Sequence, residues 1–414
     1  MNYTIIGFGG RGSLYAQLFS RIGGVKLAAV CEIIPERLEK AGRLYGLPKD
    51  KLFLSDKEFA SAGKLGDLCI VSTQDGQHKE HALMMLGAGY DLLLEKPIAT
   101  NFGDCQDIHD KAKALNRRVF ICHVLRYAPF YSVIKRELES GAYGRIAVLN
   151  LTENIAYWHF AHSYVRGSWS AVPPSAPMII AKTCHDLDII SWFMGAECKS
   201  VSSVGSLGFF MEENAPEGSS DRCFSCAVRA DCPYDAERFY ITERLDKGHT
   251  VWPVAVLCEV PTRERVEDAL KIGPYGRCVW RCGNNAVDRQ TVNMEFKGGA
   301  IANLTATAFS KDCYREIHIH CEKGEIFGDM IDNILTCSVY GKESKTIDVN
   351  ETDDSFAGHG GGDAKMVADV AAVYGGGSCV ALTTIENSMQ SHAIGFAAEE
   401  SRQNGGKLVT PFKL

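Results

Sequence analysis

The segment that decides the fold reads Thr4-Ile-Ile-Gly-Phe-Gly-Gly-Arg-Gly12. A short apolar strand runs straight into three spaced glycines. Gly7 permits a tight turn, Gly9 lets the backbone approach a pyrophosphate, and Gly12 lets the following helix pack closely on the strand. The N–H groups at the helix start then hold the anion. We therefore expect cofactor contacts from Gly7, Gly9, Gly10, Arg11 and Gly12.

A second apolar strand, Val25–Cys31, ends at Glu32, twenty residues past Gly12. A carboxylate at this place can accept hydrogen bonds from both ribose hydroxyls of a dinucleotide. Ile33 and Ile34 follow it, so a 2′-phosphate would meet repulsion from Glu32 and no cation. The sequence therefore predicts NAD as the cofactor, in preference to NADP.

The bulk properties exclude several classes of protein. A chain of 414 residues is long enough for two or three domains, and its net charge of −7 gives no reason to expect a nucleic-acid or anionic-membrane partner. No apolar run approaches the roughly 18 residues needed to span a bilayer. The first strand begins at Tyr3 and leaves no room for a signal peptide, so we expect the 16 cysteines to be reduced in a cytoplasm.

Strands and helices alternate in the first 122 residues. A nearly continuous apolar run, Asp67–Ser72, is typical of a centre strand buried on both sides. This alternation predicts a Rossmann-type domain over residues 1–122, a doubly wound parallel sheet with helices on both faces. The expected strands are Tyr3–Gly7, Lys26–Cys31, Leu68–Thr73, Asp91–Glu95 and Arg118–Cys122, and the expected helices are Arg11–Ile22, Pro35–Tyr45, Lys79–Ala88 and Cys105–Leu115.

The pattern changes over residues 123–414, where long alternating strands predict an α+β domain with an open, mostly antiparallel sheet that helices cover on one face. One covering helix is expected from about Thr384, with Thr383 and Glu386 at the spacing of a capping box, to a stop before Gly405. A segment without clear periodicity, roughly Gly208–Gly283, reads as a cysteine-containing insertion. The expected strands are Arg145–Ala156, Val287–Phe296, Gly299–Phe309, Glu316–Cys321 and Ile334–Val339.

A further motif, Glu95-Lys96-Pro97, lies at the end of the strand that begins at Asp91. With the glycine turn it resembles the Gfo/Idh/MocA family of NAD(P)-dependent sugar and cyclitol dehydrogenases, and the resemblance extends over the whole chain. It implies that a loop after the preceding strand lies against the cofactor, with contacts from Thr73, Gln74 and His78. His78 is equally well explained as a structural histidine.

Lys96 is expected at the carboxyl edge of the sheet, where ligands bind. Its ammonium can hydrogen-bond the substrate hydroxyl that loses hydride and offset the charge that develops on that oxygen. In this family a lysine at this position serves that role and contacts the nicotinamide ribose. The resemblance also implies a cis Lys96–Pro97 bond, and it makes Glu95 an orienting partner at the cofactor rather than an acid catalyst.

The second motif that the resemblance covers reads Ala181-Lys182-Thr183-Cys184-His185-Asp186-Leu187-Asp188. The family usually has Asp, three residues, then the His that works with the lysine in proton transfer. His185 is present, but Ala181 stands where the Asp is expected. An imidazole has a suitable pKa to accept the hydroxyl proton. Asp188 or Asp186 would then orient His185, or the two Asp residues form only an acidic helix start. Lys182 is a further catalytic candidate, since repulsion among two lysines and an imidazole would lower their pKa values.

Several polar and aromatic groups of the second domain are expected to contact a sugar or polyol, because aromatic faces suit C–H surfaces and paired polar groups suit hydroxyls. An ordinary aromatic core with an exposed loop is the competing interpretation. The substrate-binding candidates are Arg126, Tyr157, His159, His162, Arg166, Asp188 and His359. Asp363 either contacts substrate or caps the helix after it.

Cysteines at Cys223-x-x-Cys226, Cys232, Cys278 and Cys282 lie in the insertion. Four thiolates suit a structural zinc, which would keep a segment of little apolar periodicity ordered. The predicted ligands are Cys223, Cys226, Cys232 and either Cys282 or Cys278. Plain buried thiols and an iron–sulfur cluster are the alternatives.

The sequence thus predicts an NAD-dependent oxidoreductase that moves hydride between a secondary hydroxyl of a sugar, sugar derivative or inositol and nicotinamide. One alternative is an NAD-retaining, glycosidase-like enzyme that acts through transient C3 oxidation and elimination, as some relatives of this fold do. Another is a non-catalytic NAD or sugar sensor. The resemblance also implies a homodimer or homotetramer assembled through the open sheet.

Overall fold

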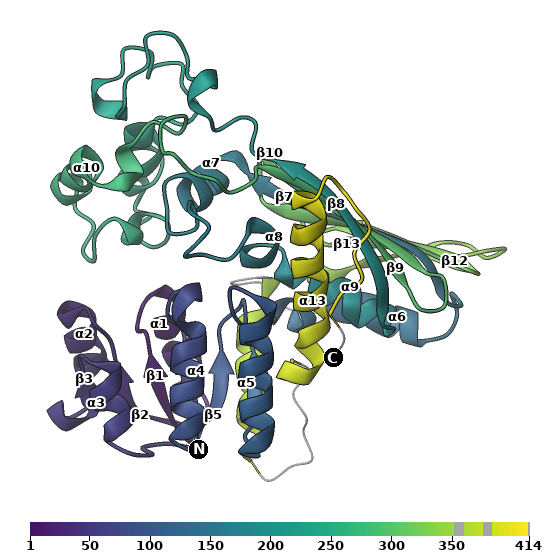
Figure 1. The fold of residues 1–414 in the computed structure, drawn as a ribbon, viewed down its shortest axis with the longest axis horizontal. Coiled ribbons are helices and arrows are strands. Elements are labelled where there is room, and N and C mark those ends of the chain that lie inside the picture. The colour runs from purple at the N-terminus through teal and green to yellow at the C-terminus, as the bar shows by residue number, and fades with distance from the viewer. Residues whose placement is uncertain (352–359, 376–382, 413–414) are drawn as a thin grey trace.

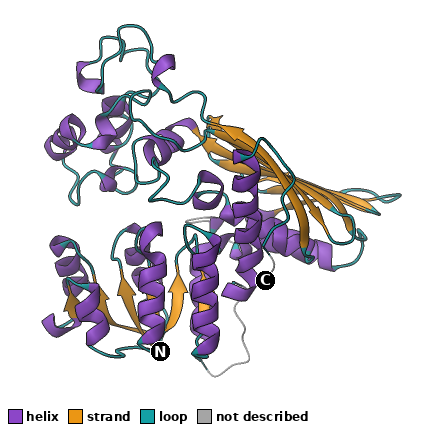
Figure 2. Cartoon of the chain, viewed as in Figure 1, coloured by secondary structure: helices purple, strands orange, loops and turns teal. Residues whose placement is uncertain are grey.

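The computed structural model describes residues 1–351, 360–375 and 383–412. Figure 1 shows the N-terminal domain, in purple and blue, beside a second domain whose large sheet extends away from it. The insertion rises above the N-terminal domain, at the end of that sheet marked by the labels β7 and β10. Helices lie on both faces of the first sheet and along one face of the second (Figure 2).

The N-terminal sheet has the strand order β3-β2-β1-β4-β5-β6, and all its pairs are parallel. β1 and β4 lie side by side at its centre, which confirms the predicted doubly wound fold and the buried centre strand. The strands are β1 (Asn2–Ile6), β2 (Lys26–Cys31), β3 (Leu52–Phe53), β4 (Leu68–Val71), β5 (Asp91–Leu94) and β6 (Val119–Ile121), and the helices are α1 (Gly10–Phe19), α2 (Pro35–Tyr45), α3 (Asp56–Ser61), α4 (His78–Gly87) and α5 (Phe102–Ala114).

Two helices from the end of the chain complete the hydrophobic cores of this domain. Met366, Val367 and Val370 of α12 (Gly362–Ala372) pack with Tyr15 and other residues under one face of the sheet. α13 (Ile385–Gln403) supplies side chains to the core on the other face. α13 begins where the sequence predicted, but the capping box of Thr383 and Glu386 does not form, because the N-cap is Thr384 and the Thr383 hydroxyl has no hydrogen-bond partner in the described part of the chain. The N-terminal fold therefore depends on residues more than 350 positions away from its first strand.

The second sheet has the order β14-β13-β12-β11-β7-β10-β9-β8 and is antiparallel except for the pair β7–β10. Buried and exposed residues alternate along β9, as expected for a sheet covered on one face. α9 packs against β7 and β10, and α13 packs against β8. The strands are β7 (Ile146–Ala156), β8 (Cys198–Ser206), β9 (Arg289–Phe296), β10 (Ile301–Ser310), β11 (Tyr314–Cys321), β12 (Gly324–Asp329), β13 (Ile334–Val339) and β14 (Lys345–Asp348), and the remaining helices are α6 (Pro129–Glu139), α7 (Tyr157–Phe160), α8 (Met178–Ala181), α9 (Cys184–Met194) and α10 (Arg263–Ile272).

The insertion contains short helical turns and a small core of its own, which includes Tyr240, Val266 and Leu270. α10 was missed in the sequence, although Thr262 caps it by accepting a 3.3 Å hydrogen bond from Arg265 N. In the described part of the chain, no helix combines the length and hydrophobicity that a membrane span requires.

Candidate active site

The glycine turn after β1 has the shape that a dinucleotide requires. Gly7 has φ +91°, and a Cβ there would lie 2.7 Å from Ser72 O. A Cβ on Gly12 would lie 2.1 Å from Gly7 O, so only glycine allows α1 to pack this close to the strand. At Gly9 the nearest protein atom would be 3.8 Å away, on Arg37, which leaves room for a ligand beside the first N–H groups of α1. The turn therefore fits a pyrophosphate.

Glu32 lies just beyond β2 and is buried. Its Oε2 accepts a 2.7 Å hydrogen bond from Phe8 N, and its Oε1 accepts a 2.9 Å bond from Ile34 N. These bonds hold the carboxylate beside the glycine turn. Each oxygen keeps a second lone pair that can accept a ribose hydroxyl.

The carboxyl end of β5 carries a buried charge network. Glu95 Oε1 accepts hydrogen bonds from Arg11 at 2.6 Å and from Tyr15 at 2.5 Å, and Oε2 accepts one from Lys96 N at 3.0 Å. Burial alone would raise the pKa of Glu95, but the charges of Arg11 and Lys96 and these hydrogen bonds outweigh it and lower the pKa. Glu95 is thus an ionised orienting group. Arg11 also pairs with Asp363 on α12 at 2.6 Å, so the Arg11 side chain fastens α12 to the sheet edge.

Lys96 reaches from this edge to the second domain. Its Nζ donates a 2.9 Å hydrogen bond to Ala181 O, at the end of α8. The Lys96–Pro97 bond is cis, as expected. The main-chain oxygen of Ala181 thus supplies an acceptor at the position where the resemblance would place an aspartate.

His185 lies in the first turn of α9, four residues after Ala181, and is 5% exposed. A second imidazole, His123, lies beside it, with the two ring centroids 5.7 Å apart. A third ring, His392, lies 5.6 Å from His123. The pKa of His123 lies well below its usual value because of burial and, next, the charge of Arg126. The sequence analysis did not identify His123 and His392, since no local pattern distinguishes them from core histidines.

Lys182 pairs with a carboxylate, Glu153, which the sequence analysis did not identify. Its Nζ lies 2.8 Å from Glu153 Oε1, and the other oxygen of Glu153 lies 2.9 Å from Arg315 Nε. Arg315 also pairs with Asp186 at 2.6 Å. Lys182 therefore faces a buried carboxylate, which offsets the expected repulsion from Lys96 and His185. Glu153 and Arg315 were missed because they meet only across the β7–β11 register.

Two of the expected substrate residues bind each other instead. Arg126 donates two 2.7 Å hydrogen bonds to the carboxylate of Asp188, and both side chains are buried. This bidentate pair uses both carboxylate oxygens and is typical of arginine recognition within a core. These contacts favour a structural ion pair between the turn Val124–Tyr127, which follows β6, and α9; substrate contact by Arg126 and Asp188 stays a prediction.

His162 and Arg166 are likewise directed into the insertion. His162 Nδ1 lies 2.7 Å from Tyr240 Oη, and its ring stacks on Tyr275 with centroids 4.8 Å apart. Burial and the charge of Arg166 lower the pKa of His162 to about 3. Arg166 donates to the carbonyl oxygens of Arg277 and Tyr234. These contacts favour a structural role for both side chains, and their contact with substrate stays a prediction.

His159 lies near charged groups of both domains, and the ring of Tyr157 contacts that of Tyr234 in the insertion. His159 Nδ1 lies 3.2 Å from Cys313 Sγ. Burial lowers the pKa of His159 well below its usual value, and the nearby charges of Lys182 and Lys96 lower it further. His159 is thus near both lysines and remains a substrate-binding candidate with Tyr157. His359 lies outside the described residues.

The loop after β4 is held mainly by backbone contacts. His78 Nδ1 lies 2.7 Å from Pro97 O, and Nε2 lies 3.2 Å from Thr73 O. Both ring nitrogens therefore face backbone carbonyls, which favours the structural explanation for His78 over cofactor contact. Thr73 Oγ1 lies 2.9 Å from His81 Nδ1, and Gln74 precedes the short turn after this loop.

The predicted zinc ligands are only partly assembled. Cys223, Cys226, Cys232 and Cys278 line one small cavity. Cys282 is outside that lining and donates from its thiol to Cys278 O at 3.2 Å. Of the two alternatives for the fourth residue, the structure therefore favours Cys278 over Cys282.

Comparison with protein families identifies the chain. The model described as the oxidoreductase family, NAD-binding Rossmann fold matches residues 1–123, and the model of the same family's C-terminal alpha/beta domain matches residues 135–410. The chain belongs to the Gfo/Idh/MocA oxidoreductase family. The resemblance recognised in the sequence is thereby confirmed.

Curated members of the Gfo/Idh/MocA family align over part of the chain. An inositol 2-dehydrogenase of Saccharopolyspora erythraea is 30% identical over 205 residues, which cover 48% of this chain and 55% of that protein. A putative oxidoreductase of Bacillus subtilis, YteT, is 26% identical over 172 residues, 41% of this chain and 40% of that protein. The aligned part thus spans about half of the curated relatives' length.

Solved structures share the fold over the whole chain. A levoglucosan dehydrogenase in complex with NADH and levoglucosan superposes with a TM-score of 0.71, 17% identity and complete coverage of both chains. The WlbA dehydrogenase of Bordetella pertussis, in complex with NADH and UDP-GlcNAcA, has a TM-score of 0.71, 17% identity and coverage of 100% of this chain and 98% of that chain. At this identity the likeness concerns the fold.

Proposed function

We propose that the protein is an NAD-dependent dehydrogenase that oxidises a secondary hydroxyl of an inositol, a sugar or a sugar derivative. The observation that carries the proposal is the position of Lys96, whose Nζ spans the domain boundary to Ala181 O, four residues before His185. A cation and an imidazole thus flank the edge of the sheet at which a dinucleotide-binding fold places its ligands. The relatives named as inositol dehydrogenases support this class of substrate.

The residues present fit the cofactor. The glycine turn and the start of α1 would hold the pyrophosphate, and Glu32 would accept the ribose hydroxyls. When bound, NAD accepts the hydride from the substrate carbon. The buried carboxylate of Glu32 favours NAD over NADP, because a 2′-phosphate placed beside it would be repelled.

Side chains of the protein then bind the substrate hydroxyl and accept its proton. Lys96 orients the substrate hydroxyl and stabilises the negative charge that develops on its oxygen. His185 accepts the hydroxyl proton as general base. Lys182, held by Glu153, acts as a positioning charge, while Tyr157 and His159 contact the substrate.

The test is a turnover screen of inositols, sugars and glycosides with NAD and NADP, following both reduced cofactor and released aglycone. The proposal predicts accumulation of NADH with an inositol or sugar and weaker turnover with NADP. Aglycone release without net NADH would establish the glycosidase-like alternative instead. Binding of NAD and sugar without turnover, unchanged in Lys96→Ala and His185→Ala, would establish the sensor.

A substitution of Glu32 tests the preference for NAD over NADP. Glu32→Ser removes the carboxylate, so we expect the ratio of kcat/KM for NAD to that for NADP to fall. Glu36→Ser, in the first turn of α2, is the matched control. A wild-type preference for NADP would contradict the role of Glu32.

A further inference from the structure

Four cysteines of the insertion line one cavity: Cys223, Cys226, Cys232 and Cys278. They come from two segments far apart in the sequence. A β-bridge between Arg222 and Arg277 joins the segments, and Cys278 N donates a 2.8 Å hydrogen bond to Asp221 O. The backbone thus brings the fourth cysteine to a Cys-x2-Cys-x5-Cys segment. We call this site the cysteine cavity.

A buried positive charge lines the same cavity. Arg166 is 6% exposed, and its guanidinium donates to Tyr234 O and Arg277 O at 2.8 Å and lies 3.5 Å from Cys223 Sγ. Within residues 1–351, 360–375 and 383–412, no carboxylate forms an ion pair with Arg166. A buried charge without a counter-charge is costly. The cysteine cavity therefore favours a negatively charged occupant.

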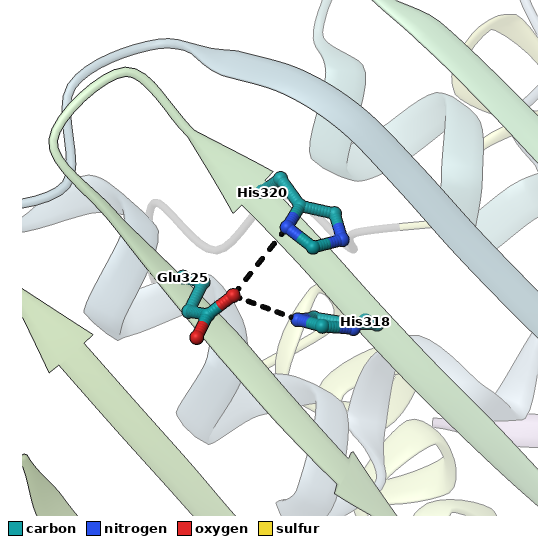
Figure 3. Close-up of side chains that lie close together, drawn as sticks. All are labelled: His318, His320 and Glu325. Atoms are coloured by element: carbon teal, nitrogen blue, oxygen red, sulfur yellow. Dashed lines mark hydrogen bonds and ion pairs between the residues drawn. The ribbon is translucent and has the colours of Figure 1, made fainter.

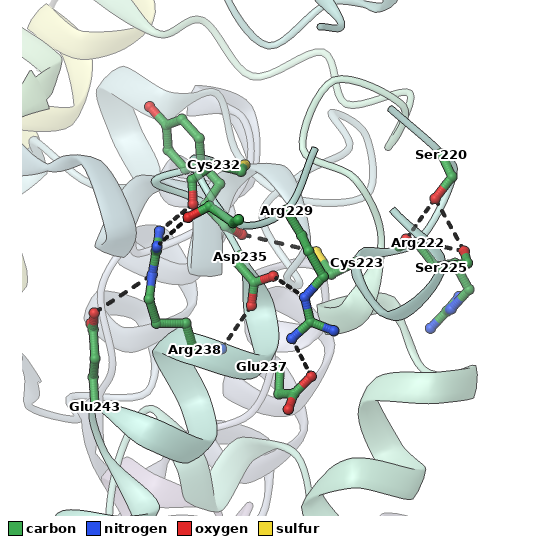
Figure 4. A network of polar contacts seen from close by, with 12 residues as sticks. Ser220, Arg222, Cys223, Ser225, Arg229, Cys232, Asp235, Glu237, Arg238 and Glu243 are labelled. Carbon is green, nitrogen blue, oxygen red and sulfur yellow. Dashed lines mark hydrogen bonds and ion pairs between the residues drawn. The ribbon is translucent and has the colours of Figure 1, made fainter. Parts of the chain in front are cut away.

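The acidic side chains nearby are engaged elsewhere. Asp235 Oδ2 lies 3.0 Å from Arg229 Nε, and Asp235 Oδ1 accepts a 2.7 Å hydrogen bond from Arg238 N. Glu237 pairs with the same Arg229. Figure 4 shows these contacts beside Cys223 and Cys232. Asp235 and Glu237 thus neutralise Arg229 and leave the charge of Arg166 unbalanced.

Besides the charge of Arg166, the cavity is lined by a residue with an unsatisfied hydrogen-bond donor. Trp280 lines the cavity, and its buried indole N–H has no hydrogen-bond partner in the described part of the chain. Hydrogen bonds from N–H groups to thiolate or sulfide sulfur are a recurrent feature of metal–sulfur sites. Arg166 and Trp280 could both supply them.

The distances between the sulfurs distinguish a zinc site from an iron–sulfur cluster. A tetrahedral zinc holds each thiolate at about 2.3 Å, which places the ligand sulfurs about 3.8 Å apart. In the described part of the chain, three or more ligand atoms of His, Cys, Asp or Glu residues lie within 4.8 Å of one another only at His318, His320 and Glu325. No three sulfurs of the cysteine cavity are therefore this close together. Sulfurs that line one cavity at wider separations suit a multi-iron cluster, which occupies the space between its cysteine ligands.

We propose that Cys223, Cys226, Cys232 and Cys278 bind an iron–sulfur cluster of the four-cysteine type, with Arg166 as its buried counter-charge. The cluster joins the two segments of the insertion, which has few regular elements and a small core. The proposal does not depend on the dehydrogenase activity.

The test is metal and sulfide analysis of the full-length protein, produced with added iron and purified without oxygen. We expect about four iron atoms and four acid-labile sulfides per chain, with the broad visible absorption of thiolate-bound iron. One zinc per chain without iron would overturn the cluster, and so would a protein with neither metal. Because the wild type is measured directly, the test does not depend on the folding of any variant.

Metal bound at a separate surface site must be subtracted from the metal content of the protein. His318 Nε2 and His320 Nδ1 lie 3.0 and 3.4 Å from Glu325 Oε2 on neighbouring strands β11 and β12, as Figure 3 shows. Two imidazoles and a carboxylate can take up zinc during purification. The analysis is therefore repeated on His320→Ala, and metal that this variant loses is not assigned to the cysteine cavity.

Variants locate the ligands. Cys226→Ser is expected to lose the visible absorption and the bound iron, whereas Cys258→Ser, another half-buried thiol of the insertion that does not line the cavity, retains both. Cys278→Ser should lose iron and Cys282→Ser should keep it. Iron and sulfide that persist in Cys226→Ser and Cys278→Ser would place the cluster elsewhere and overturn the assignment.

Discussion

Lys96 Nζ donates a 2.9 Å hydrogen bond to Ala181 O and so joins the edge of the dinucleotide-binding sheet to the second domain. A carbonyl is neutral, whereas an aspartate at this position would form an ion pair with the lysine. This contact therefore leaves the ammonium of Lys96 available to a substrate oxygen. Four residues further on, His185 lies in the first turn of α9.

Replacement of Lys96 by Met should lower kcat by about 100- to 10,000-fold, because a positioned donor and charge at the reacting oxygen is lost. NAD affinity, measured by calorimetry, should change much less. The exposed Lys64→Met is the control and should leave kcat unchanged. Equal loss of NAD binding and turnover in Lys96→Met would show that the lysine acts on the cofactor rather than on the substrate.

Replacement of His185 by Asn should lower kcat by about 100- to 10,000-fold, since the general base is removed while a polar side chain of similar size remains. The pH profile of the residual activity should lose the limb that reports the base. The exposed His249→Asn should behave like the wild type. A His185→Asn enzyme with the wild-type pH profile would assign the proton to another group.

Glu153→Gln should be strongly destabilising, by about 3 to 5 kcal/mol, because it leaves Lys182 and Arg315 without their shared buried carboxylate. Lys182→Met should cost less, since Glu153 keeps Arg315. Glu316→Gln, exposed on the same strand as Arg315, should be close to neutral. Denaturant unfolding of the three variants checks this order, and a Lys182→Met protein less stable than Glu153→Gln would contradict it.

Arg126→Met should lower stability by about 3 to 5 kcal/mol, because Asp188 would remain buried and charged without a partner. The double variant Arg126→Met/Asp188→Leu should recover part of that loss. Arg136→Met, on the exposed face of α6, is the control. If Arg126→Met raised the KM for substrate with stability intact, the pair would belong to the substrate site after all.

The protein should lose stability as pH falls below about 6.5. Burial and the charge of His123 lower the pKa of His392 to about 3, whereas an unfolded histidine titrates near 6.5. Between these values the unfolded chain binds the extra proton, so the free energy of unfolding decreases with falling pH, by about 2 kcal/mol for this histidine between about pH 7.5 and 5.

His392→Gln tests that assignment, because glutamine retains an acceptor for Ile98 N but does not titrate. The stability difference between wild type and His392→Gln should shrink as pH falls. Parallel curves for the two proteins, measured by urea unfolding at each pH, would show that His392 does not titrate on unfolding.

Local features account for what could be predicted from the sequence. The glycine turn, Glu32 and the Glu95-Lys96-Pro97 motif each act within a few residues of a strand end, so their spacing along the chain is also their spacing in the site. The strand and helix patterns of both domains were likewise readable, because each reflects which side chains alternate or recur on a buried face.

The contacts that could not be predicted are those between residues distant in sequence. Arg126 and Asp188 looked like polar substrate contacts because nothing near them in the chain offers a counter-charge. Glu153 and Arg315 likewise meet only through the register of β7 with β11.

The sequence by itself therefore determined the dinucleotide-binding fold and the family, and it predicted Lys96 and His185 as the reactive pair. Only the tertiary structure decided which charges are paired, that helices α12 and α13 complete the N-terminal cores, and that Cys278 rather than Cys282 joins the cysteine cavity. The physical reason is that motif spacing is set by the local backbone, whereas burial and charge compensation depend on which distant segments the folded chain brings into contact.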